Sequence, residues 1–492
     1  MRDLVVFAVV MLTLPSSFQR PFIGLLVFSW LAYMRPQDLC WGFARTMRLS
    51  FFVGIAMVAG WWANEQGRRR FTHWDFRTGM IVLLAALISV SYLFAHQHTT
   101  YTNRYYFEYL KIVVVALFTV GQVDSRQRLR AILWTIALSL GFFGIKGGLF
   151  GMLSGGARIM RGPGGMLEDN NDFALALVMN VPLLWYLGIS ERAVPLVKRA
   201  TQVAVFLTVV TVILTHSRGG FLALSGTALW IAWRSGKLFR AGLALALCGV
   251  AFLTFAPDHV LERLASIGDK GESSRNARFI AWATAFRMIE DNPLLGVGMR
   301  NFQARFLDYS IVPPSEGSPT YVAHNSYLQI WAESGSLAFV VYLLLLVSVF
   351  VVCRKVFRIG RSRLDLAWAA DYARMMEATT VGFLIGAFFL NRGHFDLIYH
   401  WLALVTCLAG VTFAAWRRAP EGAAARTDRR EVRVRRRGAG EPAAAAVAAP
   451  SAQAVTWRRP GRGRCRARSP ARSPRRRQDP RPHPRGPPPH LP

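Results

Sequence analysis

The hydrophobic pattern of the chain is a series of long apolar blocks separated by short basic segments. The blocks 78–95, 201–215, 337–352 and 399–416 contain almost no charged residues. They reach or approach the roughly 20 residues that a helix needs to cross the hydrocarbon core of a bilayer. Buried helices of a soluble enzyme do not recur in this way with basic residues between them. The pattern therefore predicts an all-α membrane protein.

The distribution of Lys and Arg predicts which segments face the cytoplasm, because cytoplasmic loops carry the excess of both residues. The basic segments are 64–77, 123–130, 190–199, 234–240, 354–377 and the tail after Arg417. With these inside, the segments that fall outside are 96–106, 153–172, 257–335, 393–399 and the short turn Ser217–Gly219. The longest of them, 257–335, is predicted to be one large non-cytoplasmic loop.

This alternation predicts about 12 transmembrane helices. Eleven of them are expected at 49–63, 78–95, 107–122, 131–152, 173–189, 200–216, 219–233, 237–256, 336–353, 378–392 and 400–416. Residues 4–34, with Pro15 and Pro21 inside, form either one kinked span or two. We favour one, which leaves both termini inside; two would make thirteen spans and put the N-terminus outside. The three arginines of segment 35–48 face outside on either interpretation and conflict with the charge rule.

Composition adds a basic tail to this picture. The chain is 53% hydrophobic and 18% charged, with a formal net charge of +31. Much of the excess lies in residues 417–492, where Arg, Pro, Gly and Ala dominate. Such a composition cannot bury a core, so we expect a disordered basic Arg/Pro-rich tail with no specific function and no nucleic-acid partner. The five cysteines are scattered, and we infer from them neither a disulfide framework nor a metal site.

The outer loop contains one predicted amphipathic helix, Ser274–Asp291. Its apolar residues recur at helical spacing: Phe279, Trp282, Ala283, Phe286 and Ile289. Asn292 and Pro293 end it. The helix lies either along the membrane surface, with Trp at the headgroup level, or against the rest of the protein.

Ionisable residues at the predicted outer boundary are the first candidates for chemistry. Arg218 lies in a tight turn between two predicted spans. Gly219 and Gly220 follow it and leave room for a ligand to approach the backbone. The alternative role of Arg218 is a snorkelling anchor; we favour a functional one.

Two further candidates lie in the large outer loop. Arg278 precedes Trp282 by one helical turn, on the same face. Its planar guanidinium suits phosphate oxygens, although it could be a surface charge. His324 opens the segment that leads into a span, and histidine can take or give a proton near neutral pH. A lone histidine is more often structural, but the polar residues that follow this one favour function.

Weaker candidates for substrate binding surround these three. They are Arg161, Asp169, Asn170, Asn325 and Glu333. The segment from Arg161 to Asp172 either binds a head group or sugar hydroxyls or is a turn with a helix cap. Glu333 either orients the imidazole of His324 or ends a polar span.

Four stretches of the chain resemble the O-antigen ligase and polymerase superfamily of bacterial inner membranes. They are HSRGG at 216–220, RFIAW at 278–282, NPLLGVGMRNF at 292–302 and HNSYLQIWAESG at 324–335. The opening MRDLVVFAVV, the segment 20–44 and GPGGMLEDNNDFALAL at 162–177 resemble the putative O-glycosylation ligases of exosortase systems. The resemblance covers about residues 1–416.

The resemblance implies a GT-C-like ligase architecture and a glycosyltransferase that works without metal or cofactor. The donor would be a glycan on undecaprenyl diphosphate, the acceptor a glycan or protein hydroxyl, and the active site would lie in a periplasmic loop. The resemblance also implies that Arg218 and Arg278 grip the diphosphate and that His324 serves the acceptor. Fixed guanidinium donors would stabilise the charge on the departing diphosphate.

Three readings stay open from the sequence. They are a ligase, a polymerase of the same superfamily, and a transporter of lipid-linked sugars. Transporters carry ionisable residues at mid-membrane, whereas the candidates here lie at the outer boundary. We therefore expect an enzyme. Its N-terminal helices should span 1–200, and its ligase domain 201–416.

Overall fold

The structure is a computed structural model that describes residues 1–191, 194–237, 239, 242, 267–312 and 319–418. The described part is all-α, as the pattern predicts. Its one extended pairing is an isolated backbone bridge between Arg161 and Asp169. Most of the span predicted at 237–256, the start of the outer loop and the basic tail lie outside the described residues.

Seven described helices are long and apolar enough to cross a membrane. They are α1 (Arg2–Gln19), α5 (Phe76–Leu93), α7 (Arg126–Leu153), α8 (Asn170–Ser190), α9 (Pro195–Leu214), α15 (Ser326–Ser362) and α17 (Asp396–Arg417). The other long helices are α2 (Pro21–Tyr33), α4 (Leu49–Asn64), α6 (Thr100–Gln122), α10 (Arg218–Arg234), α13 (Ile267–Asp291) and α16 (Ala367–Ala387). Short helical turns are η1 (Pro36–Leu39), α3 (Phe43–Thr46), η2 (Gly165–Leu167), α14 (Phe306–Tyr309) and η3 (Leu364–Leu366). The chain is therefore a polytopic helical membrane protein.

The helices begin where the sequence supplies caps. The side chains of Asp75, Ser125 and Ser217 each accept a hydrogen bond from a backbone N–H in the first turn of α5, α7 and α10. Thr99 and Thr102 form a reciprocal capping box at the start of α6. These caps satisfy donors that a helix end leaves unpaired. Helices α8 and α17 are the most enclosed of the spans, each with 83% of its apolar stretch buried.

Contacts between loops sort them into two ends of the helical bundle. Arg69 pairs with Asp124, Arg130 with Glu191 and Arg234 with Glu377, and these residues come from segments predicted inside or from the helix ends beside them. At the other end, Gln97 and Asn301 exchange two hydrogen bonds, and the side-chain amide of Asn170 donates to the carbonyl of Thr215. The predicted alternation therefore agrees with the way these loops pair.

The N-terminal helices differ from our favoured interpretation. Residues 4–34 form two helices, α1 and α2, joined at Arg20, and not one kinked helix. The carboxylate of Asp3 accepts hydrogen bonds from the backbone of Gly42 and Ala44, whereas the carbonyl of Phe18 accepts one from Asn64 at the opposite end. The chain therefore starts at the end that carries the outer loops and turns back at Pro21, whose fixed φ suits the first position of a helix.

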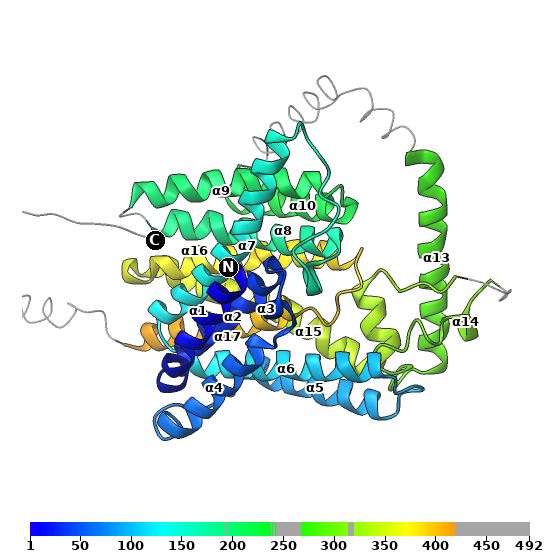
Figure 1. The fold of residues 1–492 in the computed structure, drawn as a ribbon, viewed down its shortest axis with the longest axis horizontal. Helices are drawn as coiled ribbons and strands as arrows, with labels where there is room; N and C mark the ends of the chain where they lie inside the picture. Colours follow the sequence, from blue (N-terminus) through cyan, green and yellow to red (C-terminus); the bar gives the residue numbers. More distant parts are fainter. Residues whose placement is uncertain (192–193, 238, 240–241, 243–266, 313–318, 419–492) are drawn as a thin grey trace, which may run out of the picture. The chain divides into compact units, whose positions relative to one another are not determined.

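The predicted amphipathic helix is present as α13, which lies across the end of the bundle (Figure 1). It ends at Asp291, as predicted. Its buried face, Ala281, Ala285 and Met288, packs on the protein, whereas Phe279 and Phe286 are exposed. The helix thus packs against the protein and still leaves an apolar stripe uncovered.

Helix α15 is broken at Gly335, next to the predicted start of a span at residue 336. Gly335 has a φ of 84°, and the segment after α13 lies against it. The backbone N–H of Ser336 donates to the carbonyl of Pro293 (2.8 Å), and that of Val297 donates to the carbonyl of Ala332 (2.8 Å). Residues 292–298 therefore have an architectural role, because they attach α13 to the break in α15.

We expect Gly335→Ala to destabilise the protein. A Cβ atom at this position would lie 1.9 Å from the carbonyl oxygen of Leu294, and the backbone conformation, with a positive φ and an extended ψ, alone costs an alanine about 1–3 kcal/mol. Thermal unfolding of the detergent-purified protein measures the effect. Gly410→Ala in α17, where no atom lies within 4 Å of the added Cβ, is the control and should unfold as wild type does. Equal unfolding temperatures for the two variants would refute the steric argument.

Candidate functional site

Five segments, distant in sequence, meet at the end of the bundle that carries the segments predicted outside, which we term the outer end. They are the start of α8, the turn between α9 and α10, the face of α13 around residue 278, the residues before α15, and the loop 388–395 between α16 and α17. Each carries at least one charged or titratable side chain. The site is therefore a product of tertiary packing.

The turn between α9 and α10 presents Arg218 as the first residue of α10, with its side chain exposed. The hydroxyl of Ser217 accepts a hydrogen bond from the backbone of Gly220 (3.0 Å) and caps the helix. We expected Gly219 and Gly220 to leave room for a ligand, and this prediction is wrong. Added Cβ atoms would lie 3.0 Å from Phe389 Cβ and 2.7 Å from Ala174 Cβ, so protein side chains already fill both positions.

The start of α8 is attached to the same turn. The side-chain amide of Asn170 donates to the carbonyl of Thr215 (2.8 Å). Asp169 caps α8 by accepting from the backbone of Asn171 (2.8 Å), and its carboxylate is exposed. Asn170 therefore has a structural contact, and its predicted contact with a ligand stays a prediction; Asp169 is accessible.

Helix α13 carries Arg278 and Trp282 on one face, as the spacing predicts. The indole N–H of Trp282 donates to the carbonyl of Ala323 (3.0 Å), and its ring packs edge-on against Phe388. Arg278 is half-buried, with its guanidinium carbon 6.0 Å from the ring centroid of Phe389. Trp282 thus attaches α13 directly beside His324, and Phe389 lies between Arg278 and the turn that carries Arg218.

His324 is an exposed residue with a φ of 45°, which is unusual for a side chain other than glycine. The residue after it, Asn325, caps α15, because its side-chain oxygen accepts from the backbone of Tyr327 (2.9 Å) and Leu328 (3.2 Å). Asn325 is 3% exposed. Asn325 thus caps α15, and its predicted role in substrate binding stays a prediction.

The electrostatic effects within the site show which side chains lie close together. Partial burial lowers the pKa of Arg278, and the charge of Arg218 lowers it further. Partial burial also lowers the pKa of His324, the charge of Arg278 lowers it further, and Asp169 opposes the shift. Since such effects act over short distances, the structure brings together Arg218, Arg278, His324 and Asp169. His324 is consequently neutral at pH 7 and able to accept a proton.

Two predicted residues are placed differently. Arg161 is exposed and lies opposite Asp169 in the isolated backbone bridge. Glu333 is 2% exposed, and its carboxylate accepts hydrogen bonds from Gln329 and from the backbone of Arg300 and Phe302. Glu333 therefore orders the turn at 298–302 and does not orient His324.

The sequence analysis missed an ion pair in this region. Arg392, in the loop before α17, pairs with the buried carboxylate of Asp172 in α8. The backbone N–H of Arg392 also donates to the hydroxyl of Ser326 (2.8 Å). A charged residue at the outer end of an apolar block was the available signal, but its partner is 220 residues away in the chain.

The loop before α8 is fixed by an ion pair, Arg35–Asp38, which we term the clamp. Gly164 and Gly165 of the loop pack against this pair. Arg35 Nε donates to Asp38 Oδ2 (2.5 Å). Added Cβ atoms at Gly164 and Gly165 would lie 2.9 Å from Asp38 Oδ2 and 2.3 Å from Arg35 Cζ. Both glycines have a positive φ, so a side chain there would be strained as well as blocked.

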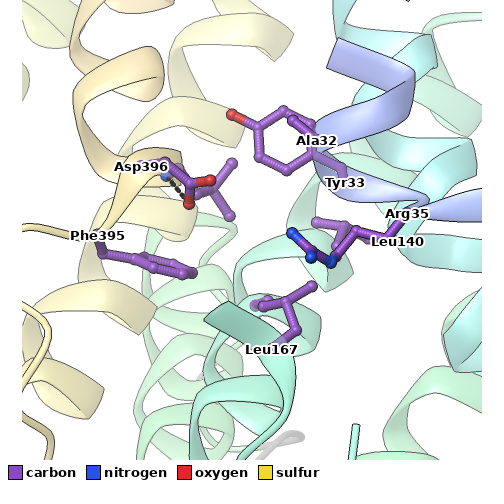
Figure 2. A pocket seen from close by; sticks show the side chains of 9 residues that line it. Ala32, Tyr33, Arg35, Leu140, Leu167, Phe395 and Asp396 are labelled. Carbon is purple, nitrogen blue, oxygen red and sulfur yellow. Dashed lines mark hydrogen bonds between the residues drawn. The ribbon is translucent and has the colours of Figure 1, made fainter. Parts of the chain in front are cut away.

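Beside the clamp lies a small pocket lined by Tyr33, Arg35, Leu167 and Asp396, among others. Figure 2 shows Arg35 and Leu167 on one side of this pocket and Asp396 on the other. The pocket therefore lies where η2, which contains Leu167, meets α2 and α17, which contain Tyr33 and Asp396.

We expect Arg35→Ala to loosen the loop 161–169, because it removes the guanidinium against which Gly165 packs. Hydrogen–deuterium exchange of the backbone amides in this loop measures the effect, and we expect at least a tenfold faster exchange. Arg45→Ala is the control, since Arg45 is exposed on α3 close by in sequence. Unchanged exchange in Arg35→Ala would mean that the clamp does not hold the loop.

The fold and this site define a polytopic membrane protein with a basic, histidine-containing site at one end of its helices. Residues 203–343 match the family model described as O-antigen ligase, and residues 1–191 match a family of unknown function, DUF5935. Residues 203–343 are thus an O-antigen ligase domain by similarity to that family model. The ligase match contains Arg218, Arg278 and His324, whereas the other match contains Arg161, Asp169 and the clamp. No curated protein matches the chain.

Proposed function

We propose that this O-antigen-ligase-like enzyme transfers a glycan from an undecaprenyl-diphosphate carrier to an acceptor hydroxyl on the periplasmic side of the bacterial inner membrane. The observation that carries the proposal is that Arg218, Arg278 and His324 come from three segments distant in the chain and meet at one place. Phe389 contacts both Arg278 and the turn that carries Arg218. Trp282 attaches α13 to the residue before His324. Two guanidinium groups close together favour an anionic ligand, and a neutral imidazole beside them favours proton transfer.

In the proposed reaction the acceptor hydroxyl gives its proton to His324 while its oxygen attacks the anomeric carbon of the donor sugar. The bond from that carbon to the diphosphate oxygen breaks, and the electron pair stays on the diphosphate. Arg218 and Arg278 stabilise the negative charge that develops there. Attack opposite the leaving group inverts the anomeric centre.

The proposal assigns charge neutralisation to guanidinium groups and not to a divalent metal ion. Within the described residues, no group of three His, Cys, Asp or Glu side chains could hold a metal. Transfer by the purified protein should consequently persist in excess EDTA. We further propose that the acceptor belongs to protein O-glycosylation or exopolysaccharide assembly of an exosortase system, as the segments 20–44 and 162–177 suggest.

We expect Arg218→Ala, Arg278→Ala and His324→Ala each to lower transfer by about a hundredfold or more, the scale on which oxyanion donors and general bases act. The assay uses protein in nanodiscs, a labelled undecaprenyl-diphosphate glycan and candidate protein, lipid-core and glycan acceptors. Arg278→Lys should also be impaired, because lysine lacks the planar fork of donors.

The control for this assay is Arg287→Ala, which removes an exposed arginine from the other side of α13. It should leave transfer unchanged.

Transfer to a growing glycan alone would identify a polymerase. Movement of the glycan across vesicles without a new glycosidic bond would identify a transporter and overturn the proposal, as would full activity of the alanine variants.

The pH dependence of transfer provides a test of the electrostatic coupling. If His324 is the base, activity is present above its pKa and is lost as the pH falls through that value. Because Arg278 lowers the pKa of His324 and Asp169 raises it, the acidic limb of kcat/KM should move to higher pH in Arg278→Gln and to lower pH in Asp169→Asn. Asparagine also caps helices, so the second variant retains the start of α8. Shifts in the same direction would contradict the assignment of the base.

A further inference from the structure

A second group of polar and aromatic side chains lies beside the proposed transfer centre, around Arg300. This residue has a φ of 60°, a conformation that costs about 1–3 kcal/mol in a residue other than glycine. The carboxylate of Glu333 accepts from the backbone N–H of Arg300 and of Phe302, and its carbonyl accepts from Gly298 (3.0 Å). The surrounding structure thus holds Arg300 in a strained conformation.

Two tyrosines of α6 lie on the other side of this guanidinium. The guanidinium carbon of Arg300 is 4.2 Å from the ring centroid of Tyr105, and the ring of Tyr101 is 4.6 Å from that of Tyr105, centroid to centroid. Tyr101 is 54% exposed, and Tyr105 is half-buried. Asn301 and Gln97 exchange two hydrogen bonds (3.1 and 3.2 Å) and tie the Arg300 turn to the start of α6.

A buried histidine near Arg300, His394, has hydrogen-bonding groups without partners among the described residues. His394 is 7% exposed, and neither of its ring nitrogens has a hydrogen-bond partner among the described residues. Burial and the charge of Arg300 lower its pKa to about 3, so it is neutral and offers one donor and one acceptor. Within the same part of the structure, Nε of Arg300 and the side-chain oxygen of Asn391 are also buried without a partner. Such groups are rare unless a ligand or water satisfies them.

This group is continuous with the transfer centre through the Asp172–Arg392 pair. Arg300 lies within electrostatic reach of Asp172, and Tyr105 lies within reach of Arg392. On the far side of the pair, Asp169 acts on His324. A ligand that extends from His324 past the Asp172–Arg392 pair would therefore meet Arg300 and the two tyrosines.

We propose that Arg300, Tyr101 and Tyr105 form a saccharide-binding shelf, which holds a sugar ring of the glycan on the tyrosine faces and hydrogen-bonds its hydroxyls through the guanidinium and His394. The proposal rests on the proposed glycan transfer. Rings that lie flat against apolar faces and are fixed by a few polar groups are the usual basis of small-ligand recognition. The shelf extends the site from the scissile bond to the neighbouring sugar.

The charges around the shelf favour a sugar over a second diphosphate. Asp172 neutralises Arg392, and the carboxylates of Asp169 and Glu333 lie nearby. Among the described residues, Arg300 has no carboxylate within 4 Å and could therefore bind an anion. A single guanidinium is, however, a weak site for a doubly charged group such as a diphosphate. A membrane-anchoring role of the tyrosines is the alternative, in which Arg300 and the buried His394 would have no part.

Two probes separate the shelf from the diphosphate site in binding experiments on the full chain in nanodiscs. The first is undecaprenyl diphosphate without a sugar. The second is the oligosaccharide released by mild acid from the lipid-linked pool of the source cells. Arg300→Gln and Tyr105→Leu should weaken oligosaccharide binding at least tenfold and leave undecaprenyl diphosphate binding within twofold. Arg218→Gln should have the opposite pattern.

Matched variants control for folding and for loss of charge. Arg305→Gln removes an arginine that also lies over a tyrosine ring, 5.2 Å from the centroid of Tyr309, but is paired with Asp308; it should bind both probes as wild type does. Tyr105→Phe retains the ring and should keep oligosaccharide binding within about threefold. All variants should elute and unfold as wild type does.

Each outcome bears on one of the two proposals. Wild-type oligosaccharide binding in Arg300→Gln and Tyr105→Leu would overturn the shelf, and so would a wild-type protein that binds undecaprenyl diphosphate but no oligosaccharide. Lower thermal stability of Tyr105→Leu with unchanged binding would identify a membrane anchor and also overturn the shelf. If the oligosaccharide binds through Arg300 but undecaprenyl diphosphate does not bind, the proposed donor fails and the shelf stands.

Discussion

The proximity of two arginine side chains is the constraint on which the outer end of this protein depends. Arg218 and Arg278 are close enough for one charge to disfavour the other, and Arg278 is partly removed from water as well. Neither effect stabilises the folded chain, so other contacts must hold these residues. The cap at Ser217, the bond from Asn170 to Thr215 and the bond from Trp282 to Ala323 supply them. An anionic ligand would remove the repulsion, and in the proposed function the two guanidinium groups would act as a preorganised anion receptor.

The N-terminal region contributes to this site although it matches a family of unknown function. Its own segments 35–38 and 164–165 lock together in the clamp, and the loop beyond them ends in Asp169 and Asn170. Asn170 holds the turn that carries Arg218, and Asp169 acts on His324. The region therefore supplies the acidic side of the site, and the matched ligase segment supplies the basic side.

The sequence predicted the parts of this structure that depend on local pattern. Apolar blocks, basic loops, the end of α13 at Asp291 and the start of an apolar span directly after Gly335 follow from composition and spacing. The N-terminal pair of helices did not follow, because segment 35–48 faces outside on either interpretation and its charges therefore do not distinguish one span from two. Contacts with distant partners could not be predicted in the same way. The carbonyl of Glu333 accepts from Gly298, and Arg392 has a partner 220 residues away.

Backbone strain marks the same region of the molecule. Within the described residues, the side chains other than glycine with a positive φ are Arg35, His216, Arg300 and His324. Arg35 belongs to the clamp, Arg300 to the proposed shelf and His324 to the proposed transfer centre, while His216 lies in the turn before Arg218. Glycine would adopt each conformation at lower cost, and arginine is not among the residues that favour it. Stability alone would not select arginine at positions 35 and 300, so the guanidinium groups must contribute something that glycine cannot. A strained residue that is held by its surroundings is typical of sites that bind or react, and this supports one continuous ligand site from Arg218 to Arg300.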